Sequence, residues 1–117
     1  MEKIKTVCVM RDLVKAVAEL QDTLQERLGI SLNEAMVLCS IGDGTATAGE
    51  ISRSTGFKAP QTSKVIRAVE GKRLIERQCG NEDHRRMEFT LSEDGRRLLL
   101  RLKTEEIPLP PFLRPLF

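Results

Sequence analysis

The segment "TATAGEISRSTGFKAPQTSKVIRAVE", residues 45–70, decides the fold. A short extended piece leads into a helix that Thr47 is placed to cap and that Gly56 ends. A second helix begins almost at once, with Pro60 in its first turn, where a missing backbone N–H costs nothing. Its apolar side chains recur on one face, at Val65, Ile66 and Val69. Two short helices with a tight connection predict a helix-turn-helix, whose second helix is able to enter a major groove.

A β-hairpin is predicted immediately downstream. The runs "RLIERQC" (residues 73–79) and "MEFTL" (87–91) are short and compatible with strands, and the charged stretch "GNEDHRR" (80–86) joins them. The tip of this hairpin carries two adjacent arginines, Arg85 and Arg86. A hairpin that follows a helix-turn-helix is the wing of a winged helix.

Helices are expected on the N-terminal side of this core. In residues 3–30 the apolar side chains recur at three- and four-residue spacings, which predicts a long amphipathic helix whose stripe packs partly on another chain. The stretch "SLNEAMVLCSIGDG" (31–44) predicts a short buried helix. Ser31 and Glu34 have the spacing of a capping box, and Cys39 is expected in the core.

The C-terminal part completes the architecture. Ser92 is placed to cap a final helix, which the tail "IPLPPFLRPLF" (107–117), with four prolines in eleven residues, cannot continue. We therefore expect a mainly α fold with a small β-hairpin wing. A winged helix-turn-helix (residues 31–92) is flanked in this prediction by N- and C-terminal dimerisation helices (1–30 and 93–117).

Composition favours a cytoplasmic globular protein. The 117 residues suit one domain, with 40% hydrophobic and 31% charged residues. No apolar run approaches the ~20 residues that cross a bilayer, and charges interrupt the N-terminus, so neither a membrane span nor a signal peptide is predicted. Three widely spaced cysteines favour reduced thiols, and we expect no metal or cofactor. Four Phe with no Trp or Tyr argue against a platform for single-stranded bases.

Charge is distributed unevenly although the formal net charge is only +2. Residues 1–50 carry five basic and eight acidic side chains, a net charge of −3. Residues 53–77 carry seven basic and two acidic side chains, a net charge of +5. A local excess of positive charge over the predicted helix-turn-helix is what contact with DNA phosphates requires.

Residues 31–100 resemble the winged-helix core of the MarR (multiple antibiotic resistance regulator) family of bacterial transcription factors. The family's Asp-x-Arg wing element matches residues 83–85, and its Leu-Thr-x-x-Gly ending matches residues 91–95. The end of the recognition helix and the Leu-Ile/Val-x-Arg start of the next strand match residues 69–70 and 74–77.

The resemblance implies a role for each polar residue of this core. Arg85 is the side chain expected to enter the minor groove, with Asp83 as its orienting partner, and Arg86 is expected to contact phosphate. Gln61 is suited to read adenine and Arg67 guanine. The full set of predicted DNA contacts is Ser52, Ser54, Lys58, Gln61, Thr62, Ser63, Lys64, Arg67, Asp83, Arg85 and Arg86.

Two features depart from the family pattern. Arg73 stands where the family usually has Gly before the strand, and Gly71 lies two residues earlier. The part after the wing is shorter than the two helices usual in the family. The dimer interface and the family's ligand crevice are therefore expected to differ.

The function predicted from these features is a dimeric DNA-binding transcriptional regulator, a repressor that reads a pseudo-palindrome in double-stranded DNA, and the sequence does not disclose whether a small-molecule effector exists. One alternative is a winged-helix module that binds a protein through the Pro-rich tail. A second is a thiol-based redox sensor using Cys8, although this chain lacks the tyrosines of the peroxide-responsive branch. An enzyme is not expected, because no pairing of nucleophile and base is evident.

Overall fold

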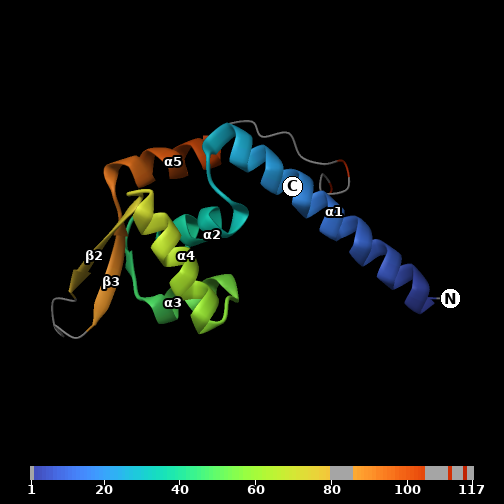
Figure 1. Cartoon of the computed structure of the whole chain (residues 1–117), viewed down its shortest axis with the longest axis horizontal. Helices are drawn as coiled ribbons and strands as arrows, with labels where there is room; N and C mark the ends of the chain where they lie inside the picture. Colours follow the sequence, from blue (N-terminus) through green and yellow to red (C-terminus); the bar gives the residue numbers. More distant parts are fainter. Residues whose placement is uncertain (1, 80–85, 105–110, 112–114, 116–117) are drawn as a thin grey trace. The chain divides into compact units, whose positions relative to one another are not determined.

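The computed structural model describes residues 2–79, 86–104, 111 and 115. Two compact units are present, one containing α1 and the other containing the remaining helices and strands described below. The elements in chain order are α1 (Glu2–Leu28), α2 (Leu32–Ile41), β1 (Thr45–Ala46), α3 (Ala48–Thr55), α4 (Ala59–Gly71), β2 (Ile75–Cys79), β3 (Met87–Leu91) and α5 (Glu93–Thr104) (Figure 1). The prediction of a mainly α fold with a small β wing is confirmed.

The wing belongs to a three-stranded antiparallel sheet with the order β1-β3-β2. The extended piece predicted before the helix-turn-helix is β1, which pairs with β3 so that Thr45 lies opposite Thr90. The hairpin runs from the pair Ile75 and Leu91 at its base to the pair of Cys79 and Met87. Figure 1 shows β2 and β3 extending along one side of α3 and α4.

The second unit has a single apolar core beneath the helix-turn-helix. α4 buries the face predicted from its periodicity, and Val69 is fully inaccessible. Ile51 of α3 and Leu38 of α2 are equally inaccessible, and Phe89 of β3 is 4% exposed. Because large side chains from all these elements are buried, helices and sheet are stabilised together.

The predicted caps of α3 are present. The Thr47 hydroxyl accepts the Glu50 N–H, and the Glu50 carboxylate accepts the Thr47 N–H, both at 3.1 Å. Gly56 ends the helix in the left-handed conformation, with φ 82°. This reciprocal arrangement is the capping box. It fixes the start of α3 at a definite residue.

Ser92 caps α5 as predicted and also ties it to the end of α4. Its hydroxyl accepts the Gly95 N–H at 3.0 Å and donates to the Arg73 carbonyl at 2.8 Å. Arg73 itself has a φ of 60°, which glycine adopts more easily than other residues. A glycine at this position, as in the resembled family pattern, would adopt this φ with less strain than the arginine that this chain has there.

Two further observations bear on the predictions. Cys39 is exposed on α2, so the prediction that it is a core residue is wrong. The helices of the described ranges include none with the length and apolar character that a bilayer crossing requires.

Candidate nucleic-acid interface

The exposed face of α4 carries the longest polar side chains of the helix-turn-helix. Lys64 and Arg67 lie opposite the buried stripe, and Gln61 and Ser63 flank them, all four exposed. Lys58 is the N-cap of α4 and makes no side-chain cap hydrogen bond. The Lys58 side chain therefore leaves the first-turn N–H groups of Ala59 and Gln61 uncapped, while Pro60 has no N–H.

Only part of the basic segment found in the sequence is available to an outside partner. Lys72 pairs with the buried Glu34 at 2.8 Å. Arg77 pairs with Glu70. Four cations of α3, of α4 and of its N-cap have no ion pair among the described residues, and we call them the basic face: Arg53, Lys58, Lys64 and Arg67. The basic face therefore spans both helices of the motif.

Thr62 does not contribute to this surface. Its side chain is 1% exposed, so the prediction that it faces the major groove is wrong. Its hydroxyl donates to the Lys58 carbonyl at 3.0 Å and lies 2.6 Å from the Ser52 hydroxyl. Either hydroxyl can be the donor in this shorter bond. The pair links α3 to α4 from inside the motif.

Ser54 is also hydrogen-bonded within the chain. Its hydroxyl lies 3.0 Å from that of Ser40, which in turn reaches the Met36 carbonyl at 2.8 Å. Two of the three serines predicted to bind phosphate, Ser54 and Ser52, thus join α2 to α3 and α3 to α4, and Ser54 is exposed as well. Ser63, the remaining one, is exposed on α4.

The tip of the wing falls outside the described residues, and Asp83 and Arg85 lie there. Arg86, next to the tip, is described. Its guanidinium lies 3.1 Å from a Glu50 carboxylate oxygen and 3.5 Å from one of Glu88. The residue predicted to contact phosphate therefore has two carboxylate partners in the free protein.

The other strand of the wing is held by a stronger pair. Arg77 donates to both carboxylate oxygens of Glu70, at 2.7 and 2.9 Å, and its guanidinium lies 5.6 Å from the centre of the Phe89 ring. A bidentate contact fixes direction as well as distance. The pair with Glu70 raises the pKa of Arg77. Both residues were already conspicuous in the sequence as parts of the matched family pattern, but their partnership was not.

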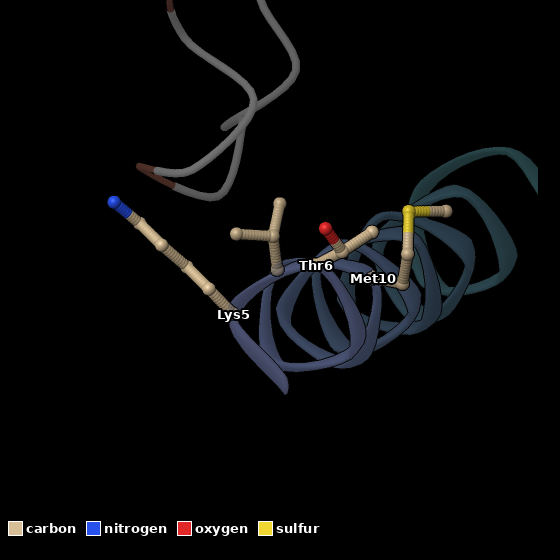
Figure 2. Close-up of a pocket in the computed structure, with 4 residues that line it drawn as sticks. Lys5, Thr6 and Met10 are labelled. Carbon is tan, nitrogen blue, oxygen red and sulfur yellow. The ribbon is translucent and has the colours of Figure 1, made fainter. Parts of the chain in front are cut away.

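Other residues outside this surface bear on thiol and metal chemistry. Although the Cys39 side chain is exposed, partial desolvation raises the pKa of its thiol, and the charge of Lys103 opposes this only in part, so the reactive thiolate is disfavoured at this residue. No group of three His, Cys, Asp or Glu is placed to bind a metal in the portion of the chain that the structure describes. Figure 2 shows Lys5, Thr6 and Met10 projecting from one side of α1. With Val9 they line an open hollow.

Comparison with known proteins agrees with this geometry. A family model described as HxlR-like helix-turn-helix matches residues 33–104. No curated protein matches the sequence significantly.

Several solved structures share the fold. A structure of BpsR from Bordetella bronchiseptica, in work on the regulation of its DNA binding by 6-hydroxynicotinic acid, is 22% identical with a TM-score of 0.74, over 84% of this chain and 70% of that one. The regulator BldR from Sulfolobus solfataricus is 16% identical with a TM-score of 0.73, over 86% and 73%. A complex of S. aureus MepR with DNA is 21% identical with a TM-score of 0.65, over 81% and 79%.

Proposed function

This chain belongs to the HxlR-like helix-turn-helix family, and from that premise we propose that it is a dimeric repressor reading a pseudo-palindromic site in double-stranded DNA. Its class, a winged-helix DNA-binding transcriptional regulator and not an enzyme, agrees with the predicted resemblance. Two questions follow: how this surface binds DNA, and in what assembly.

The basic face is the observation that carries the proposal. Lys64 and Arg67 project from the side of α4 that the core leaves exposed, which is the geometry of a recognition helix in a major groove. Arg67 is suited to a bidentate contact with guanine and Gln61 to one with adenine. Lys58 and the open first turn of α4 are suited to a phosphate.

The wing supplies the second contact in this proposal. Arg85 enters the neighbouring minor groove and Asp83 orients it, as the resemblance implies. A narrow, A·T-rich minor groove favours such an arginine through its negative potential.

In this proposal a second copy of the chain completes the DNA-binding unit. α1 leaves apolar side chains in solvent, with Val7 67%, Val14 66% and Met10 50% exposed. Exposed apolar residues at this spacing on one helix favour pairing with an equivalent helix. In a two-fold dimer the two α4 helices would meet half-sites about one helical turn, ~34 Å, apart.

Fluorescence anisotropy tests the proposal, with labelled DNA from the promoter region beside the protein's own gene and a scrambled duplex, each over a salt series. We expect tighter binding to the promoter, and Arg67→Ala should lose about 1–3 kcal/mol of that preference. If Lys64 contacts a phosphate, Lys64→Ala should lower the salt slope by about 0.9.

A matched control is Arg96→Ala, which removes one exposed cation from α5 in the same unit. It should leave both affinity and salt slope nearly unchanged. Equal weak binding to both duplexes by the wild type would contradict the regulator proposal and favour a protein-binding role for the winged helix.

A further inference from the structure

Both strands of the wing are joined to the helix-turn-helix by an arginine–glutamate pair. Arg77 on β2 reaches back to Glu70 on α4 through two bonds of 2.7 and 2.9 Å. Arg86, directly before β3, reaches Glu50 on α3 at 3.1 Å. The two pairs therefore connect one strand to each helix of the motif.

Each pair is itself held in place. Glu50 is fixed by the capping box with Thr47, so its carboxylate is not free to follow Arg86. Arg77 lies over Phe89, a ring that is only 4% exposed. An ion pair with one end already constrained loses less side-chain entropy on forming than a pair between two free side chains.

The wing needs such support toward its tip, because only Ile75, Phe89 and Leu91 of its two strands are buried in the core. β1 contributes only two paired residues to the sheet. On β2 every residue after Ile75 is exposed, so the hairpin leaves the core quickly. An isolated two-stranded hairpin is marginally stable in water, and two-stranded ribbons twist more strongly than wider sheets.

We propose that Glu50, Arg86, Glu70 and Arg77 are positioning residues that set the direction of the wing relative to α4, so that the wing tip and the recognition helix reach adjacent grooves together. This rests on the proposed function. It also gives Arg86 a different role from the predicted phosphate contact.

Glu50→Gln separates the two roles of Arg86, because they predict opposite signs. If Arg86 binds phosphate and Glu50 only competes for it, removing this carboxylate raises DNA affinity. If the pair positions the wing, Glu50→Gln lowers affinity despite removing a negative charge, by about three- to fivefold for an exposed pair. Gln still accepts the Thr47 N–H, so the capping box is retained.

Glu88→Gln is the matched control. It removes the other carboxylate near Arg86, which lies on the wing itself and does not connect the wing to α3. We expect unchanged or slightly higher affinity from this control. Arg86→Met should lower DNA affinity as much as Glu50→Gln does and should keep the salt slope of the wild type. The double variant should bind DNA hardly more weakly than either single variant.

Glu70→Gln and Arg77→Met test the second pair in the same way. The specific signature of all four variants is lost discrimination at the base pairs flanking the recognition-helix site, with discrimination retained beneath α4. Circular dichroism melts of each variant check that the fold is intact, and Arg77→Lys replaces Arg77→Met if the latter unfolds.

Two results would overturn the proposal. One is higher affinity in Glu50→Gln, and the other is a salt slope lowered by about 0.9 in Arg86→Met, which marks a lost phosphate contact. Failure of the regulator proposal looks different, since the wild type would then bind promoter and scrambled DNA equally before any variant is compared.

Discussion

Gly95 lies where the first turn of α5 meets the backbone between α4 and β2. A Cβ at this position would run into the carbonyl oxygen of Leu74, the same oxygen that accepts the Ser92 N–H at 2.9 Å. The Leu74 oxygen is a backbone atom and not the end of a flexible side chain, so the clash is relieved only if the backbone moves. The glycine that ends the matched wing pattern is therefore needed for a close approach, not for an unusual φ.

Gly95→Ala is expected to destabilise the protein by about 1–3 kcal/mol, the usual cost of overpacking. The measurement is urea unfolding followed by circular dichroism. Gly71→Ala is the control, because nothing lies within 4 Å of a Cβ there and the residue is helical. This control should gain up to about 1 kcal/mol. Equal stabilities for the two variants would contradict the explanation.

Of the predictions made for single residues, some are confirmed by the structure and others are wrong. The caps at Thr47 and Ser92 follow from local spacing, and both are present. Thr62 was assigned to the groove although it lies three and four residues before the buried Val65 and Ile66, a signal that it shares their face. Cys39 is exposed because a short helix between apolar neighbours still has one open side.

The start of α3 concentrates several interactions on one carboxylate. Hydrogen bonds from the Thr47 N–H and hydroxyl, followed by smaller contributions from Arg86, hold the pKa of Glu50 below its ordinary value of 4.5. A carboxyl whose pKa is lower in the folded state binds its proton more weakly there than in the unfolded chain. It therefore stabilises the fold above the unfolded value, and this contribution is lost as pH falls through the folded pKa.

Glu50→Gln should accordingly lower the melting temperature at neutral pH, with a gap to the wild type that narrows below about pH 4.5. Thermal melts between about pH 7 and about pH 3 give the measurement. A gap that stays constant over this range would show that ionisation of Glu50 does not contribute to stability.

The order of elements was readable from periodicity and breakers, since each helix is long enough to show its stripe. β1 was predicted only as an extended piece, because two residues carry no strand pattern and their pairing partner on β3 is far along the chain. The partnerships of Glu50 with Arg86 and of Glu70 with Arg77 are tertiary. No local pattern in a single sequence specifies them.

For the whole molecule the main prediction concerns α1. Val14 is 66% exposed in a single chain, so a charge there costs the monomer little. We expect Val14→Glu to halve the mass seen by sedimentation and to weaken promoter binding, because two half-sites are then no longer engaged by one particle. Lys15→Glu places a carboxylate on the polar side of the same helix and should remain dimeric. A wild type that is monomeric when bound to a full site would contradict the dimer.

The class of function was predictable from the whole sequence because charge and fold agreed. The excess of basic side chains over residues 53–77 indicated a DNA surface only in combination with the predicted winged helix. The division of these cations could not be foreseen, since Lys72 and Arg77 neutralise Glu34 and Glu70 within the unit while Lys64 and Arg67 remain available.

The pairing of β1 with β3 has a consequence for synthesis. Thr45 cannot pair with Thr90 until Thr90 has been synthesised, whereas α3 and α4 can form as soon as they leave the ribosome. At about 5–20 residues per second, the 20 residues from the end of α4 to the end of β3 take roughly one to four seconds. Throughout that interval the surfaces that Phe89 and Leu91 later cover remain open to chaperones. A nascent chain thus completes its winged helix only when nearly all of the core residues have been translated.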